Sequence, residues 1–422
     1  MNKFINLLFK RPIIIVLIII LLFFFPAGLA TAPEGVDLLH AVSIGIDKAE
    51  EGLEVSVLAF VITPHEQFSE SYFLISAKAE TLTEAMDLIG INLGKRLITV
   101  HTGIIVISQE FAEAGLLDSF NYLFRSNSIT NDTFILCTSS KAKEMLQSEQ
   151  KLIVSAGARL EELGLFNEKY LIASDINLQS FYRGYFNPTR SSVISLIELK
   201  EEEEATQTSM SGESQQETST AEGEGGQSSG GGSESEKQKY IQNTGKAIVL
   251  YDGKLKTIMD EVEMRGINWL GSNIQNIAIK AENVSDQNYE NATLFYSVEG
   301  NEVKKNSYFI NGKPVMEFTI KLYVRARQVL NEDLWTEKQD ISNIKNYLTQ
   351  AVRDKLENTI KTELSIGLQK LIANQTDVID IYKTLNYQNH FAFQKWFDAL
   401  EDKNDYLREV DYRVTVRVKA TD

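Results

Sequence analysis

The sequence predicts an α+β protein in which small mixed or antiparallel sheets are flanked by helices, in several domains, with one N-terminal transmembrane or signal helix. Three observations lead to this prediction. Strand and helix periodicities alternate in both halves of the chain, an acidic segment separates the halves, and an apolar stretch lies near the first residue. We expect four parts, at 1–32, 33–199, 200–239 and 240–422.

The apolar stretch 13–30 predicts export across a membrane. Its uninterrupted part, Ile13–Phe25, follows three basic residues, and such charges stay on the cytoplasmic side. A spanning helix needs about 17 to 25 residues and a signal-peptide core about 7 to 15, so the 18 residues here fit a retained anchor or a cleaved signal. Both outcomes are open from length alone. The predicted anchor residues are Ile13, Leu17, Ile20, Phe23 and Phe25.

The region 33–199 is predicted to mix helices and strands, as one unit or as two subdomains. Thr81 followed by Glu84 is a capping-box start, and apolar residues then recur at helical spacing. Strands are expected at 53–62 and 103–108, and the second is apolar enough to be buried on both faces. Further strands are expected at 133–137 and 192–199, and further helices at about 109–124, 140–164 and 174–182.

The segment 200–239 cannot form a core. It holds ten Glu, seven Gly and eight Ser, with Met210 and alanines as its only apolar residues. Ten Glu against three Lys give it a charge of −7 out of the −16 of the whole chain. Because so little apolar surface cannot offset chain entropy, we expect a flexible acidic tether.

The region 240–422 is predicted to be a second α+β domain. Asp252 and Gly253 separate two short apolar runs, which is typical of a β-hairpin. The segments 318–326 and 410–418 alternate strictly between apolar and polar residues, as half-buried strands do. Between them, apolar residues step by three or four from Ile341 to Leu371, which predicts one helix of about 30 residues.

The composition argues against several functions. A net charge of −16 without a basic patch disfavours nucleic acid as a partner. The four histidines have no second ligand at metal-binding spacing, and Cys137, the sole cysteine, lies in an apolar run where a thiol is usually inert. No nucleophile motif or phosphate-binding loop is present. We therefore expect no enzyme, no metal and no cofactor.

A few polar residues still allow a functional reading beside a structural one. Asp377 and Asp380 could share a helix face as paired carboxylates, although capping of a helix that starts there is the simpler reading. Gly45 and Asp47 could form a ligand loop, although a bend and a turn before a strand is simpler. His101 could be a general base, although a histidine at a strand entrance is more often structural.

The order of the segments resembles a known family. In the first half it is carried by "DLLHAVSIGIDKAEEGLEVSVLAF" and "ETLTEAMDLIGINLGKRLITVHTGIIVISQEFAEAGLLDSFNYLFR". In the second half it is carried by "GKAIVLYDGKLKTIMDEVEMRGINWLGS", "FTIKLYVRA", "TDVIDIYKTL", a tryptophan at Trp396 and the closing "YRVTVRVKA". In this order the segments are similar to the Ger(x)C family of spore germination proteins. Gly45, Asp47, His101, Asp377 and Trp396 occupy recurring positions of its pattern, with a structural or interface role.

The resemblance implies a non-catalytic C subunit of a nutrient germinant receptor. It implies an α+β fold and a place on the outer face of the spore inner membrane. The partners that it implies are the other receptor subunits, one transporter-like membrane protein and one with a large soluble region. No catalytic residue is carried over from the family.

One departure bears on the anchor. Family members usually carry a lipobox cysteine that takes a lipid, whereas "PAGLA" places Leu29 after Gly28. With no lipid available, we expect the apolar stretch to be retained as the membrane anchor. The alternative function is an extracytoplasmic solute-binding module that binds a germinant directly, near Gly45 to Asp47 or near Asp377. An exported cell-wall hydrolase is disfavoured, because no acid/base pair was found.

Overall fold

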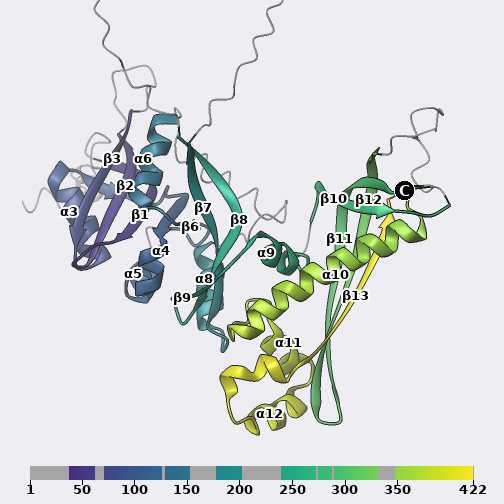
Figure 1. Ribbon diagram of the computed structural model, residues 1–422. Helices are drawn as coiled ribbons and strands as arrows, with labels where there is room; N and C mark the ends of the chain where they lie inside the picture. Colours follow the sequence, from purple (N-terminus) through teal and green to yellow (C-terminus); the bar gives the residue numbers. More distant parts are fainter. Residues whose placement is uncertain are drawn as a thin grey trace, which may run out of the picture.

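The computed structural model describes eight stretches of the chain between residues 38 and 421. Two β-sheets lie side by side along the molecule, and helices pack on each of them (Figure 1). The residues described are 38–61, 71–125, 129–152, 177–201, 239–271, 274–287, 289–330 and 347–421.

The first sheet has nine strands in the order β3-β2-β1-β5-β6-β7-β8-β9, with β4 paired to β1. Its centre is parallel, since β1, β5, β6 and β7 run the same way, and both outer parts are antiparallel. It is therefore mixed, as predicted, but larger than the small sheets expected. The strands are β1 Leu38–Lys48, β2 Leu53–Val61, β3 Ser71–Ala79, β4 Arg96–Ile98, β5 Ile104–Ser108, β6 Phe134–Thr138, β7 Ser191–Glu201, β8 Lys239–Tyr251 and β9 Lys254–Met259.

Helices cover both faces of this sheet. One face packs on α6, Ala142–Leu152, through Ile104, Val106 and Leu136. The other face packs on four helices through a larger apolar cluster. All five residues of β5 are buried, which confirms the prediction of a strand buried on both faces. The four helices are α3 Leu82–Leu93, α4 Gln109–Ala114, α5 Leu117–Arg125 and α8 Leu178–Phe186.

The first-half helices begin partly where the sequence predicted. The Thr81 side chain accepts from the N–H of Glu84 at 3.2 Å, as predicted. The helix expected at 109–124 is two helices, because Gly115 has φ 117° and the N–H of Leu116 bonds to the carbonyl of Gly253 instead. The helix expected at 174–182 begins later, at Leu178, with Asn177 as its cap.

The predicted hairpin at Asp252 and Gly253 is confirmed, since both have positive φ, 51° and 72°, between β8 and β9. The hairpin extends the first sheet, because β8 pairs with β7 over its whole length. Residue 240, where the second domain is predicted to begin, is therefore not a boundary between the sheets. Sequence patterns could not show this, since pairing partners lie far apart in the chain.

The second sheet has four strands in the order β10-β11-β12-β13. β10 and β11 pair antiparallel, as do β11 and β12, while β13 pairs parallel to β12. Helices between β12 and β13 form the crossover that a parallel pair needs. The strands are β10 Ile277–Val284, β11 Ala292–Ile310, β12 Lys313–Leu330 and β13 Asp411–Ala420, and the helices are α9 Glu261–Asn268, α10 Gln350–Ala373, α11 Ile381–Gln388 and α12 His390–Asp398, followed by the 3-10 helix Lys403–Glu409.

The helices of the described residues cover one face of the second sheet. Met316, Phe318, Ile320, Leu322 and Val324 are buried against them, while the residues that alternate with these from Glu317 to Tyr323 are not buried. β13 repeats this alternation, as predicted. α10 lies across this covered face (Figure 1).

The long helix is shorter than predicted. It begins at Gln350, because Thr349 is its N-cap: the Thr349 side chain accepts the N–H of Val352 at 3.3 Å. Leu348 is buried but not helical. Because it fits the helical spacing of apolar residues, the sequence wrongly predicted that the helix includes it. Ile341 and Ile344 lie outside the described residues.

Other predictions also fall outside. The apolar stretch 13–30 is not among the described residues, and neither is 202–238 of the acidic tether, whose ends belong to β7 and β8. Within the part of the chain that the structure describes, no helix has the length and apolar character needed to cross a bilayer.

Candidate functional site

Gly45 and Asp47 lie inside β1, so the reading of a bend and a turn before a strand was wrong. The turn comes later, at Glu50 to Gly52. The Asp47 carboxylate accepts the backbone N–H groups of Ala142 at 2.8 Å and Lys143 at 3.0 Å. These are the first N–H groups of α6, which have no partner within the helix. Burial raises the pKa of Asp47, and these hydrogen bonds oppose that rise.

Gly45 lets the same helix approach β1 closely. A Cβ at this position would lie 3.1 Å from Leu146 Cδ1 and 3.2 Å from Ala142 Cβ. Such contacts are tighter than ordinary packing, so a larger residue would push α6 away. Gly45 and Asp47 thus hold α6 on the sheet, and the Asp47 carboxylate is already occupied by donors of its own chain.

Asp377 is nearly fully buried, with 4% of its surface exposed. Its carboxylate accepts the N–H groups of Ile381 at 2.9 Å and Tyr382 at 2.8 Å, which open α11. It also accepts the hydroxyl of Tyr406 at 2.6 Å. Burial raises the pKa of Asp377, against the effect of these donors. These contacts are those of a helix cap.

Asp380 does not pair with Asp377. It has φ 63° and makes no side-chain cap bond, although it is the residue that precedes α11. Its carboxylate instead accepts a long bond, 3.4 Å, from the amide of Asn187 in the first half. The two acids therefore do not form a pair around one site.

The surroundings of Asp377 join the two sheets. Its N–H donates to the hydroxyl of Ser191, the first residue of β7, at 3.2 Å. Asn187 reaches Asp380, and the hydroxyl of Tyr251 donates to Asn404 at 3.4 Å. Two strands of the first sheet, β7 and β8, and the loop after α8 thus contact the helical region of the second sheet.

Trp396 belongs to an aromatic cluster under the β11–β12 hairpin. Its ring lies 6.2 Å from that of Phe309 and 5.8 Å from that of Phe393. Edge contacts of this kind stabilise packing beyond the area buried. The cluster continues through Tyr382, Phe397 and Tyr406.

His101 is exposed in the turn before β5. Its ring lies 5.7 Å from that of His40, which in turn stacks on Phe60 at 5.2 Å. Burial and the nearby His101 lower the pKa of His40. The two rings therefore meet near the start of β1, seven residues before Asp47 on the same strand.

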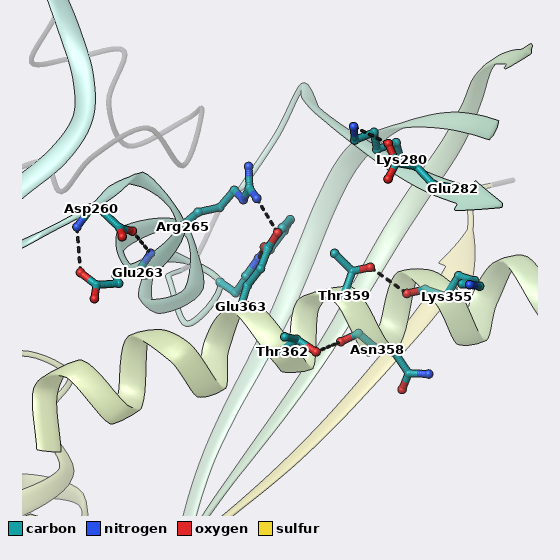
Figure 2. A network of polar contacts seen from close by, with 11 residues as sticks. Asp260, Glu263, Arg265, Lys280, Glu282, Lys355, Asn358, Thr359, Thr362 and Glu363 are labelled. Carbon is teal, nitrogen blue, oxygen red and sulfur yellow. Dashed lines mark hydrogen bonds and ion pairs between the residues drawn. The ribbon is translucent and has the colours of Figure 1, made fainter. Parts of the chain in front are cut away.

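Sequence reasoning missed a cavity of about 430 Å³ beside α9 and α10. Among the lining residues, the Glu363 carboxylate accepts a hydrogen bond from Arg265 Nη2 at 2.5 Å (Figure 2). It also accepts the indole N–H of Trp269 at 2.8 Å. A second ion pair, Lys280 with Glu282 at 2.5 Å, lies on β10 (Figure 2). Lys355 also lines the cavity, with no ion-pair partner among the described residues. The apolar part of the wall is Ile279, Phe295, Leu356 and Ile360.

The two helices at this cavity meet through glycines. A Cβ on Gly266 would lie 2.1 Å from the carbonyl oxygen of Glu363, and one on Gly367 would lie 2.6 Å from that of Glu263. No side chain fits there without moving a helix. The signal in the sequence was two glycines inside helical patterns, which otherwise disfavour a helix.

The described residues hold no group of three or more His, Cys, Asp or Glu that could bind a metal ion. Cys137 is buried in β6, and burial raises the pKa of its thiol. The arrangement can therefore offer charged and aromatic contacts, but we find no nucleophile beside a base in these parts of the chain.

Two family models match the chain. The one described as "Spore germination protein N-terminal domain" matches residues 36–199, and the one described as "Spore germination B3/ GerAC like, C-terminal" matches residues 244–422. No match was found among curated proteins. The solved structure titled "Crystal Structure of the GerBC protein" is similar with a TM-score of 0.51 and 11% identity, over 90% of this chain and 97% of that one. At this identity the likeness concerns the fold alone.

Proposed function

The chain belongs to the Ger(x)C family of spore germination proteins, and we propose that it acts as the non-catalytic C subunit of a nutrient germinant receptor. The observation that carries this proposal is that the two family models together match nearly all of the chain on either side of the acidic tether. In this proposal the N-terminal helix holds the subunit at the outer face of the spore inner membrane.

The proposed action is docking on the other receptor subunits. The second sheet supports it, because its uncovered face presents polar side chains to solvent. We call this surface the open face, and it consists of Glu302, Lys304, Glu317, Thr319, Lys321, Tyr323, Arg413, Thr415 and Arg417. A specific interface buries about 800 Å² on each partner.

Side-chain chemistry supports a non-catalytic role. The buried carboxylates of Asp47 and Asp377 are committed to backbone N–H groups, and the Cys137 thiol is buried in a strand. A catalytic acid or base needs access to a substrate proton. These groups are used instead to position helices.

The test of this function is genetic. Spores that lack the chain should lose germination in response to at least one nutrient while forming normally, and the full-length gene should restore the response. A matched control is the gene with Gly300→Ala, a position where an added Cβ meets nothing within 4 Å. Unchanged germination of the deletion strain with every nutrient tested would contradict the proposal.

One observation favours the alternative of direct solute binding. The cavity beside α9 and α10 has a ligand-like volume of about 430 Å³ and is lined by Lys355 and an apolar wall, beside the ion pairs of Arg265 with Glu363 and of Lys280 with Glu282. The sites first considered, Gly45 to Asp47 and Asp377, offer carboxylates that are already occupied.

Equilibrium binding separates the two functions. The full chain in detergent would be titrated with amino acids and sugars, and with the variant Lys355→Ala for comparison. Solute binding that Lys355→Ala weakens would support the alternative, and failure to bind would leave docking as the function. Lys361→Ala is the matched control, because Lys361 lies on the same helix but does not line the cavity.

A further inference from the structure

Two large aromatic side chains stand almost fully in solvent at one end of the molecule. Tyr387, near the end of α11, and Phe391, in the first turn of α12, are each 89% exposed. Ile310, at the end of β11, is 42% exposed. Exposed aromatic residues that gather in one place often mark a contact surface. We call this surface the tip, defined by Ile310, Tyr387 and Phe391.

The tip is held in place by polar contacts between the hairpin and the helices. The N–H of Ser307 donates to Gln388 Oε1 at 2.6 Å, and Asn389 Nδ2 donates to the carbonyl of Ser307 at 2.8 Å. These bonds fix the β11–β12 turn beside the junction of α11 and α12, and both lie at the same end of the second sheet (Figure 1). Hydrogen bonds between β11 and the junction of the two helices therefore hold the segments that carry the aromatic residues in place.

The charge of the tip differs from that of the chain. The segments that build it, 303–316 and 381–397, contain five lysines and no acidic residue, in a chain with a net charge of −16. Lys305 is directed inward, to the carbonyl of Ile379, and Lys313 pairs with Asp411 at 2.7 Å. Lys304 belongs to the open face. Lys383 and Lys395 are exposed, lie four residues from Tyr387 and Phe391 in their helices, and pair with no carboxylate of the described residues.

The shape also distinguishes possible partners. The β11–β12 turn is exposed at Asn311 and Gly312, which adopt φ 51° and 82°, so the tip protrudes. A protruding end with aromatic residues and the two exposed lysines Lys383 and Lys395 suits the headgroup region of a bilayer, where Tyr and Phe rings lie at the interface and Lys side chains contact anionic lipids.

We propose that the tip binds the surface of a bilayer rich in anionic phospholipid, with Ile310, Tyr387 and Phe391 entering the headgroup region. This contact depends on the residues of the tip and not on the apolar stretch 13–30 or on receptor partners. It would give the second sheet a fixed orientation toward the membrane.

The test must report on the tip alone, because the apolar stretch 13–30 could bring the full chain to a vesicle by itself. Ala392 is exposed beside Phe391 and would be replaced, Ala392→Cys, in a Cys137→Ser background and labelled with a fluorophore. The full chain would be reconstituted in phosphatidylglycerol vesicles that contain lipids with a quencher at the headgroup. The control label is at Lys419→Cys, near the end of β13, which lies at the other end of the second sheet (Figure 1).

The proposal expects quenching at residue 392 and none at residue 419. It expects loss of that quenching in Tyr387→Ser with Phe391→Ser, and in vesicles of phosphatidylcholine alone. No quenching at 392 in phosphatidylglycerol would overturn the proposal, as would equal quenching in the double variant. Protection of the label from a water-soluble quencher without lipid quenching would identify a protein contact instead and would also overturn it.

Discussion

The two sheets of this protein are built from similar strands but covered differently. Every residue of β5 in the first sheet is buried, because α6 lies on one face and α4 and its neighbours lie on the other. In the second sheet β12 alternates between buried and unburied residues from Met316 to Val324, because the helices of the described residues lie on one face. Helices thus cover both sides of the first sheet, whereas in the described part of the chain they cover one side of the second.

This difference separates stability from function. Apolar area removed from water stabilises by about 25 cal/mol per Å², so the doubly covered strands should dominate folding. Polar residues on the open face contribute little to folding and remain free to bind another protein. Substitutions in the two sheets should therefore have opposite consequences.

The largest effect is expected in the first sheet. Ile107→Ala removes apolar volume from a residue with no exposed surface and should cost about 2 to 5 kcal/mol of unfolding free energy. Thr319→Ala, on the open face, should change it by less than about 0.5 kcal/mol. Urea unfolding of both variants measures the two values, and equal losses would break the comparison.

The next effect is at the contact of α9 with α10, beneath the cavity. Gly367→Ala places a Cβ 2.6 Å from the carbonyl oxygen of Glu263, and overpacking of this kind costs about 1 to 3 kcal/mol. Gly300→Ala in β11 meets no atom within 4 Å and serves as the control. Thermal unfolding measures both, and a Gly367→Ala protein as stable as the control would show that the helices can separate freely.

A smaller effect, dependent on pH, is expected at Asp47. Its loss as the cap of α6 should cost about 0.5 to 2 kcal/mol. Since burial raises its pKa above the ordinary 3.8, the folded state holds the proton more tightly than the unfolded state. The stability that this gives is complete below pH 3.8 and is lost as the pH rises through the raised pKa.

The measurement is urea unfolding of the wild type and Asp47→Asn over a series of pH values. The stability of the wild type relative to the variant should fall as the pH rises above about 4. A difference that stays constant with pH would show that the Asp47 carboxyl does not titrate differently in the two states.

These effects bear on what local sequence can predict. The turn at Asp252 and Gly253 and the alternation at 410–418 follow from chemistry within a few residues, and both were predicted correctly. The joining of β8 to β7 depends on residues separated by the acidic tether, so no local pattern contains it. Leu348 shows a related limit, since a buried residue at helical spacing need not be helical.

The candidate sites show the same division. The capping role of Asp377 could be read from Asn374 and Asp380 nearby, but its bond with Tyr406 joins residues 29 apart in the chain. The ion pair of Arg265 with Glu363 joins residues 98 apart. The tip needs both a hairpin and two helices to be assembled, so its exposure is visible only in the fold.

The smallest effect on stability is expected on the open face. Arg417 is exposed on the open face, and no ion pair among the described residues includes it, so Arg417→Glu reverses one charge there without breaking a pair. We expect an unchanged denaturation midpoint and a weaker association with receptor partners. A lowered midpoint would show that the open face contributes to folding, against the comparison of the two sheets.

The most direct test of the central claim is co-purification of the native chain from detergent-solubilised spore membranes. We predict that it elutes with the transporter-like membrane subunit and with the subunit that has a large soluble region. Elution of the chain alone, while those two subunits remain intact and bound to each other, would contradict the claim that it works by docking on them.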